Sequence, residues 1–462
     1  MAAWSVAPGP VSAAEAAGER AFVRVSPRDS RYFELSDGRA YIPIGLNIVG
    51  PPRGDFDGME AWFRKLSANG GNYVRVWLGS SYFDVEHARS GQYDPERAER
   101  IDRLLAMARK YGIRLKLCVE SFRHLGEGKK SVFAKALHHV SQGGPAESTA
   151  DFFNGGRGRE QFKQKLAWFA RRYGSDPTVF GWELWNEMDA IQAGDWKAWT
   201  TVMLPELHRL FPQNLAMQSL GSYDNISKRK RYEDLCRLEG NDVLQVHRYL
   251  DLGASWEICH GPVDLLTADA VGELLAFGVR KPVLLAESGA VEPQHSGPLK
   301  LYEKDQAGII LHDVLFAPFF RGAAGPGHIW HWDVYVDRQD LWRHFGRFAQ
   351  AVQGIDPPAE GFEFRQVEHP RLRVLVLQGR HTLLAWCRDR QNTWQSELAE
   401  DRPPEKILGA AVDLGIPADW RADVRVSTYD PWTDRRSEAT VARGRVMLPD
   451  FSRSIVISIQ RR

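Results

Sequence analysis

Two glutamates occupy positions where a pair of carboxyl groups could carry out acid–base and nucleophilic chemistry. Glu187 follows closely on the apolar run Val179–Trp185, and Glu287 directly follows the apolar run Val283–Ala286. Cleavage of a glycosidic bond requires one carboxyl group that arrives protonated and a second that arrives ionised. If both runs are strands whose ends meet at one site, the two glutamates form such a pair.

Further polar and aromatic residues lie in or just after apolar runs and are expected to surround this pair. Arg, His and Tyr side chains can separate the pKa values of two carboxyl groups through charge pairing and hydrogen bonding. Indole rings offer flat faces that suit ring-shaped ligands, although packing in the core is an equal alternative for Trp77, Trp185 and Trp330. Glu183 is expected to be the buried partner of a cation. The candidate ligand-binding residues are Asn47, Arg75, Asn186, His247, Tyr249, Trp330 and Trp332.

Eight apolar runs would have to position these residues. They are continuous in Val, Ile and Leu rather than alternating, which is typical of strands buried on both faces. The runs are Tyr41–Leu46, Tyr73–Leu78, Leu115–Val119, Val179–Trp185, Leu215–Ser219, Val243–His247, Val283–Ala286 and His328–Trp332.

Amphipathic segments between the runs predict helices. Asp94 can cap a helix that begins at Pro95 and ends at Gly112, with an apolar stripe spaced i, i+3, i+4, i+7. Further helices are expected over residues 162–174, 301–320 and 341–352. Eight strands alternating with helices over about 300 residues predict a closed (β/α)₈ TIM barrel. The alternative, an open doubly wound sheet, usually carries GxGxxG after its first strand, whereas residues 45–50 read Gly-Leu-Asn-Ile-Val-Gly.

The domain organisation follows from a change of pattern near Asp356-Pro357-Pro358. We expect a catalytic α/β barrel over residues 29–355 and a C-terminal all-β antiparallel sandwich over residues 356–462, where short strand runs lie between turn-rich stretches. Residues 1–28 are expected to be a flexible N-terminus with a possible remnant of a signal sequence. This favours a secreted or periplasmic protein, with a cytoplasmic one as the alternative.

The composition narrows the range of partners. The 462 residues include 60 Lys and Arg against 59 Asp and Glu, a net charge of +1, which argues against a general binder of nucleic acid or anionic membranes. No apolar run approaches the roughly 18–20 residues that span a bilayer. Cys236 and Cys259 could pair or stay free, and no cysteine–histidine cluster has zinc spacing, so no metal or cofactor is expected. The oligomeric state stays open.

Several segments of the sequence resemble those of a known family. Residues 176–187, Asp-Pro-Thr-Val-Phe-Gly-Trp-Glu-Leu-Trp-Asn-Glu, resemble the acid/base strand of retaining glycoside hydrolases of clan A, especially glycoside hydrolase family 5 and its mannan endo-β-mannosidases. Residues 281–287, Lys-Pro-Val-Leu-Leu-Ala-Glu, resemble the strand that ends in the nucleophile. Weaker matches in the same order are Val74-Arg75-Val76-Trp77, His247-Arg248-Tyr249 and Ile329-Trp330-His331-Trp332.

The resemblance implies a double displacement at a β-linked sugar. It assigns the acid/base role to Glu187 and the nucleophile to Glu287, with carboxyl groups about 5–5.5 Å apart. It also implies that Asn186 holds the 2-hydroxyl of the sugar and that Arg75 supports the nucleophile. The remaining implied roles are a hydrogen bond from Tyr249 to the nucleophile, a glycone contact from His247 and a sugar-stacking floor from Trp332.

Substrate choice stays open at this stage. Residues 120–124 read Glu-Ser-Phe-Arg-His where mannanases carry Asn-Asn-Trp, and these loops shape the outer subsites. Mannose, glucose and galactose, and internal or terminal cleavage, are therefore all retained. A carbohydrate-binding barrel without catalysis is the alternative from another class, although two mutually repelling carboxylates would serve a pure binder poorly. An ester or amide hydrolase lacks its GxSxG nucleophile motif here.

Overall fold

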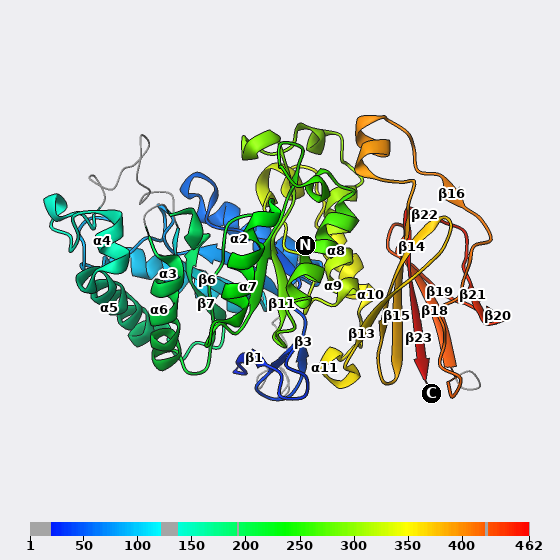
Figure 1. Ribbon diagram of the computed structural model, residues 1–462, viewed down its shortest axis with the longest axis horizontal. Helices are drawn as coiled ribbons and strands as arrows, with labels where there is room; N and C mark the ends of the chain where they lie inside the picture. Colours follow the sequence, from blue (N-terminus) through cyan, green and yellow to red (C-terminus); the bar gives the residue numbers. More distant parts are fainter. Residues whose placement is uncertain (1–19, 122–136, 192–193, 421–423, 462) are drawn as a thin grey trace, which may run out of the picture.

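The computed structural model describes residues 20–121, 137–191, 194–420 and 424–461. One part of the molecule is built on a five-stranded parallel sheet in the order β4-β5-β6-β7-β8, and two further parallel strands, β9 and β11, pair with each other. These strands are β4 (Gly45–Asn47), β5 (Tyr73–Trp77), β6 (Arg114–Ser121), β7 (Val179–Asn186), β8 (Leu215–Met217), β9 (Leu244–His247) and β11 (Val283–Glu287). Figure 1 labels β6, β7 and β11 of this part.

Hydrogen bonds between neighbouring segments close these strands into a ring. The amide of Asp242, just before β9, donates to the carbonyl of Ala216 in β8 at 2.9 Å. Ser288 forms a parallel bridge with Ile329, and the Asn47 amide donates to the Ile329 carbonyl at 3.1 Å. Residues 328–330 thus fill the eighth position as a short extended segment. The predicted (β/α)₈ barrel is confirmed, and all eight predicted strand runs contribute to it.

The helices cover the outside of this ring. They are α2 (Phe56–Ala68), α3 (Pro95–Lys110), α4 (Thr149–Asn154), α5 (Gly156–Tyr173), α6 (Trp196–Leu210), α7 (Arg229–Arg237), α8 (Val263–Leu275), α9 (Ile309–Arg321) and α10 (Arg343–Ala351). As predicted, the Asp94 side chain caps α3, accepting from the Glu96 amide at 2.8 Å. The helix expected over residues 301–320 begins only at Ile309. The Asp305 carboxylate accepts from the Gly308 and Ile309 amides, both at 2.8 Å, and so sets a later start.

The C-terminal part is antiparallel, as predicted. A six-stranded sheet has the order β13-β14-β15-β23-β18-β19, and two smaller sheets, β16-β22 and β17-β21-β20, complete this part. A separate apolar cluster that includes Val374, Ile457 and Val446 draws on both the large sheet and the smaller ones. The strands of the large sheet are β13 (Glu363–Val367), β14 (Leu372–Gln378), β15 (Thr382–Asp389), β18 (Val424–Asp430), β19 (Arg435–Glu438) and β23 (Ser454–Arg461). Those of the smaller sheets are β16 (Lys406–Ile407), β17 (Ala411–Val412), β20 (Val441–Ala442), β21 (Arg445–Met447) and β22 (Phe451–Ser452).

The barrel and the β-sheets share a buried junction beside α9 (Figure 1). Arg388 of β15 donates to Asp313 of α9 at 2.8 Å, and both side chains are almost fully buried. Arg373 of β14 donates to Asp264 of α8, also at 2.8 Å. These charged pairs fix the β-sheets to the barrel helices at two points.

The expectation of a flexible N-terminus was wrong for residues 20–28, while residues 1–19 lie outside the described part of the chain. β1 (Val23–Val25) pairs with β2 (Phe33–Leu35), and β2 pairs with β3 (Ala40–Tyr41), in an antiparallel sheet. The buried Glu34 carboxylate accepts from Arg24 at 2.7 Å and from Arg28 at 2.9 Å. A charged network anchored on a buried carboxylate therefore orders this segment.

Two other sequence-based questions are answered by the fold. All four cysteines are buried free thiols, so Cys236 and Cys259 do not pair. Among the described residues, none of the helices has the length and apolar character needed to cross a membrane.

Candidate active site

A cavity of about 660 Å³ lies at the carboxyl ends of the barrel strands. Its volume falls within the range of small-molecule sites. Residues that follow β7, β8, β11 and the eighth strand segment line it. Of the nine predicted site residues, the structure brings six to this cavity, namely Asn186, Glu187, Tyr249, Glu287, Trp330 and Trp332.

The two glutamates meet at this cavity from different strands. Glu187 follows β7 and Glu287 ends β11, and a carboxyl oxygen of each lies within 4.8 Å of the other. Double displacement uses carboxyl groups about 5–5.5 Å apart, whereas inversion needs about 6.5–9.5 Å to admit a water molecule. The separation observed is the short one, as in retaining enzymes.

Both oxygens of Glu287 are held by hydrogen bonds from the protein. Oε1 accepts from Nη1 of Arg75, and Oε2 accepts from the Tyr249 hydroxyl at 2.8 Å. The guanidinium of Arg75 is itself fixed by Glu183, which accepts from Nε at 2.8 Å and from Nη2 at 2.9 Å. The Glu287 carboxylate is therefore oriented from two sides before any ligand binds.

Glu187 has a different environment. Its backbone lies in the left-handed region, with φ of 49° and ψ of 51°, directly after β7. Burial raises the pKa of Glu187 to about 7, and the negative charge of Asp189 contributes to the increase. A carboxyl group with this pKa is available as a proton donor near neutral pH.

His247 lies between the two carboxyl groups. Its Nδ1 is 2.9 Å from Oε1 of Glu187 and 3.5 Å from Oε2 of Glu287. Burial lowers the pKa of His247 to about 4, so the ring is neutral at pH 7. A neutral imidazole can hydrogen-bond one of these carboxyl groups without adding a charge to the site.

Three of the predicted ligand-binding residues, Asn47, Arg75 and His247, are fully buried and do not line the cavity. Asn47 donates through Nδ2 to the Ala286 carbonyl at 3.1 Å and accepts from Arg75 at 3.3 Å. The polar atoms of Asn47 and Arg75 are therefore engaged by protein groups beneath the cavity, and Arg75 contacts Glu287. Their observed contacts orient other side chains of the site.

The structure also separates core tryptophans from cavity tryptophans. Trp77, Trp330 and Trp332 line the cavity. The ring centroids of Trp77 and Trp330 are 5.2 Å apart, and those of Trp330 and Trp332 are 5.6 Å apart. Trp185 is buried and packs edge-on against Trp199 at 5.9 Å. The prediction that Glu183 is the partner of a buried cation is confirmed, since it contacts both Arg75 and Lys116.

Sequence reasoning missed several cavity residues that come from irregular loops. Asp224, Lys228, His295 and His331 all line the cavity. Their only signal in the sequence was that they follow strand runs by a few residues. Loop residues without a functional role have the same position.

Within the described part of the chain, two side-chain groups have the composition of a metal site. Glu187, His247 and Glu287 form one, and Glu86, Glu120 and His138 form the other. In the first, Arg75 and Tyr249 already engage the oxygens of Glu287. In the second, the Lys165 ammonium lies 3.3 Å from Glu86 and contacts Glu120 as well. In both groups, protein donors therefore already contact carboxylate oxygens.

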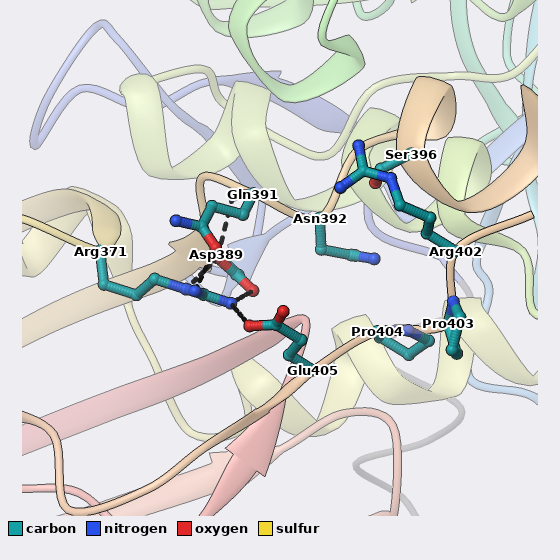
Figure 2. A pocket seen from close by; sticks show the side chains of 9 residues that line it. All are labelled: Arg371, Asp389, Gln391, Asn392, Ser396, Arg402, Pro403, Pro404 and Glu405. Atoms are coloured by element: carbon teal, nitrogen blue, oxygen red, sulfur yellow. Dashed lines mark hydrogen bonds and ion pairs between the residues drawn. The ribbon is translucent and has the colours of Figure 1, made fainter. Parts of the chain in front are cut away.

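A smaller cavity of about 60 Å³ lies among the loops of the C-terminal part (Figure 2). Arg371 reaches across it to Asp389 at 2.8 Å and to Glu405 at 2.9 Å (Figure 2). The volume is below the range typical of ligand sites, and Arg371, Asp389 and Glu405 are engaged with one another. It does not compete with the barrel cavity as a site for a sugar.

Comparison with known proteins agrees with this geometry. The profile of the family described as cellulase (glycosyl hydrolase family 5) matches residues 44–307. Mannan endo-1,4-beta-mannosidase 3 of Oryza sativa subsp. japonica is 26% identical over 354 residues, which cover 70% of this chain and 71% of that protein. Mannan endo-1,4-beta-mannosidase 7 of Arabidopsis thaliana is 25% identical over 313 residues, which cover 60% of this chain and 69% of that protein.

Solved structures share the fold at low sequence identity. The endo-beta-1,4-mannanase from Thermotoga petrophila has a TM-score of 0.51 at 16% identity, covering 90% of this chain and 92% of that one. A putative glycoside hydrolase from Bacteroides vulgatus ATCC 8482 has a TM-score of 0.56 at 13% identity, and the alignment covers 96% of this chain and 83% of that one. Both alignments extend beyond the barrel into the C-terminal β-sheets.

A TIM barrel with two carboxyl groups converging at the ends of its strands defines the class of retaining glycoside hydrolases. Since the family profile matches more than half of the residues, the chain belongs to glycosyl hydrolase family 5. The protein is a retaining β-glycoside hydrolase, and its substrate is a carbohydrate.

Proposed function

We propose that this protein hydrolyses β-mannosidic bonds with Glu187 as the acid/base and Glu287 as the nucleophile. The observation that carries these roles is the approach of the two carboxyl groups within 4.8 Å at one cavity, in unlike surroundings. Glu287 is held by Arg75 and Tyr249, while burial and Asp189 raise the pKa of Glu187 to about 7.

The first step forms a covalent intermediate. The Glu187 carboxyl group gives its proton to the glycosidic oxygen while an oxygen of Glu287 attacks the anomeric carbon. The bond to the leaving group breaks and an ester to Glu287 forms. The hydrogen bonds from Arg75 and Tyr249 orient the attacking carboxylate, so little reorganisation is needed.

The second step releases the sugar with the β configuration. Esterification removes the negative charge of Glu287, which favours the ionised form of Glu187. Glu187 then takes a proton from water, the water oxygen attacks the anomeric carbon, and the ester bond to Glu287 breaks. Two inversions at one carbon give overall retention.

We further propose that Asn186 and Trp332 bind the sugar whose bond is cleaved, and that His247 supports this binding indirectly by positioning the two carboxyl groups. Asn186 accepts from Arg75 through Oδ1 at 2.7 Å, which turns its amide nitrogen away from that contact, and it lines the cavity. Trp332 lines the same space, where an indole face can stack on a sugar ring. His247 presents its Nδ1 between the two carboxyl groups and acts on the sugar through them.

Mannose is favoured over glucose and galactose because the curated relatives are mannan endo-1,4-beta-mannosidases. The net charge of +1 supports a carbohydrate partner without nucleic acid or membrane binding.

Export to the periplasm or the medium is proposed from residues 12–17, Ser-Ala-Ala-Glu-Ala-Ala, which resemble the end of a secretory signal. The proposed domain boundary at residue 356 lies between the end of α10 and the start of β13.

The test is a panel of nitrophenyl β-mannoside, β-glucoside and β-galactoside, followed by mannan, glucomannan and galactan. The expected result is fastest turnover of mannosides, with β-mannose as the first anomer detected by NMR. Faster turnover of the glucoside or galactoside would replace the proposed sugar. An α-anomer as first product would overturn double displacement, and no turnover on any substrate would favour a non-catalytic binding barrel.

A further inference from the structure

The loop between β8 and α7 lies directly beside Glu187. The Gly221 amide donates to Asp189 at 2.7 Å, and a Cβ atom at Gly221 would lie 4.0 Å from Cβ of Glu187. The Tyr223 amide donates to the carbonyl of His247 at 2.7 Å. This loop therefore forms the wall of the cavity on the side of the proposed acid/base.

That position has a consequence for the substrate, and it rests on the proposed function. Glu187 protonates the oxygen of the leaving group, so the leaving group must lie alongside Glu187 when the bond breaks. Glu287, on the other side of the anomeric carbon, is engaged by Tyr249 and Arg75. The part of the cavity next to the loop is then the place of the leaving sugar.

Two charged side chains of this loop line the cavity there. The Lys228 ammonium donates to the Ser222 carbonyl at 2.6 Å and to Oδ1 of Asp224 at 2.7 Å. An ammonium has three N–H donors, and the third has no partner among the residues that the structure describes. On the far side of the carboxylate, Nε2 of His295 lies 4.0 Å from Oδ2 of Asp224. A hydrogen-bond donor on Lys228 and an acceptor oxygen on Asp224 are thus available next to each other.

The loop is fixed before any ligand binds. Lys228 ends the short 3-10 helix η6 (Ile226–Lys228), and the Asn225 side chain caps it by accepting from the Ser227 amide at 2.8 Å. The same Asn225 side chain donates to Ser255 at 2.8 Å, which ties the loop to a neighbouring one. Ordering a side chain that is already held costs little on binding.

We propose that Lys228 and Asp224 form the binding subsite for the leaving sugar, with the Lys228 ammonium donating to one hydroxyl and the Asp224 carboxylate accepting from a neighbouring one. Their opposite charges face the same space and compensate each other. The subsite therefore takes a neutral, hydroxyl-rich sugar in preference to one that bears a carboxylate. Both residues are specificity-determining and act on the group that departs, not on the sugar that becomes attached to Glu287.

The test uses the reverse of departure, because an acceptor sugar must enter through the subsite that the leaving sugar occupied. The enzyme is given 4-nitrophenyl β-mannobioside as donor and mannobiose as acceptor. Chromatography then yields the ratio of transfer product to hydrolysis product. Glu187 acts as base in both branches, so a change in its pKa cancels from the ratio. Unfolded molecules form neither product and cancel as well.

The variants are Lys228→Met and Asp224→Asn, with Lys230→Met as the matched control. Lys230 lies on α7 with its side chain 72% exposed, and it pairs with Asp234 outside the cavity. A hydrogen bond to a charged group is worth roughly tenfold in binding, so each subsite variant is expected to lower the transfer ratio by about that factor. Lys230→Met is expected to leave the ratio unchanged.

Different results would refute the subsite and the proposed function. If nitrophenol is released normally but the ratio stays unchanged in both subsite variants, the subsite is refuted and the proposed function stands. An equal fall in Lys230→Met would also refute the subsite. If the wild-type enzyme releases no nitrophenol, the assignment of function fails, and the subsite fails with it.

Discussion

Two fully buried arginines illustrate how one chemical arrangement serves two purposes. Arg75, in the barrel, donates to Glu183 and Glu287, and Arg388, at the junction of the barrel with the β-sheets, donates to Asp313 at 2.8 Å. The contacts are alike in kind and burial. What differs is the surroundings of the carboxylate, because Glu287 borders the cavity of about 660 Å³ while Asp313 is enclosed between α9 and β15.

This difference shows what distinguishes the proposed nucleophile from a structural carboxylate. Close pairing with arginine does not distinguish the two sites, since it fixes a side chain in either case. Space next to the carboxylate, together with a second carboxyl group within 4.8 Å, is found for Glu287. Variants at the two sites should therefore separate loss of activity from loss of stability.

The largest effect is expected for Glu287→Ala, which removes the attacking oxygen. Hydrolysis of nitrophenyl β-mannoside should fall below detection while the circular dichroism spectrum stays that of the folded protein. Added azide should restore slow turnover with an α-mannosyl azide product, because the small anion enters from the vacated side. Substantial turnover of this variant without azide would show that Glu287 is not the nucleophile.

The next effect is expected for Glu187→Ala. Loss of acid–base assistance should slow cleavage of mannotriose by about 10²–10⁴-fold. The first step on an activated nitrophenyl mannoside should suffer much less, since nitrophenolate departs without a proton. Kinetics on the two substrates provide the measurement, and equal losses on both would contradict the acid/base role.

At the junction, Asp313→Ala is expected to reduce stability and leave catalysis intact. Removing one partner leaves the Arg388 charge buried without its carboxylate, which costs about 3–5 kcal/mol in unfolding free energy. Denaturant unfolding measures this loss, and kcat/KM at 25 °C should stay near the wild-type value. An unchanged unfolding midpoint would show that the pair does not stabilise the junction.

The smallest effect concerns pH. Because the pKa of Glu187 is raised to about 7, kcat/KM should decline above neutral pH as the acid loses its proton. Asp189 contributes to this increase through its negative charge, so Asp189→Asn should move the basic limb of the profile to lower pH, by roughly one unit or less. The amide oxygen can still accept from Gly221. A shift to higher pH would contradict this assignment of charge.

The sequence predicted the convergence of the two cavity glutamates better than their surroundings, for a physical reason. Glu187 and Glu287 follow long apolar runs, and in a barrel the ends of such strands meet at one face. Asn47 and Arg75 also lie on barrel strands, but side chains inside a barrel fill several layers, and the pattern does not reveal the layer. In the folded protein both side chains lie beneath the cavity, engaged by protein groups.

The loop residues could not be predicted at all. Lys228 and His295 come from irregular segments whose sequence has no periodicity, and their positions depend on hydrogen bonds such as that of Asn225 with Ser255. The late start of α9 has a similar origin, since the Asp305 side chain competes with the helical pattern that the apolar residues suggest. The first case depends on a contact between distant segments, and the second on a local contact of Asp305 with amides three and four residues later.

The left-handed backbone conformation of Glu187 limits how far the thermal stability of this enzyme can be increased. A residue with a side chain pays about 1–2 kcal/mol for that conformation, and glycine adopts it freely. Selection for heat tolerance alone would thus favour Glu187→Gly, a change that removes the proposed proton donor. Because the proposed mechanism depends on Glu187, screens for more stable variants must measure product formation at every round.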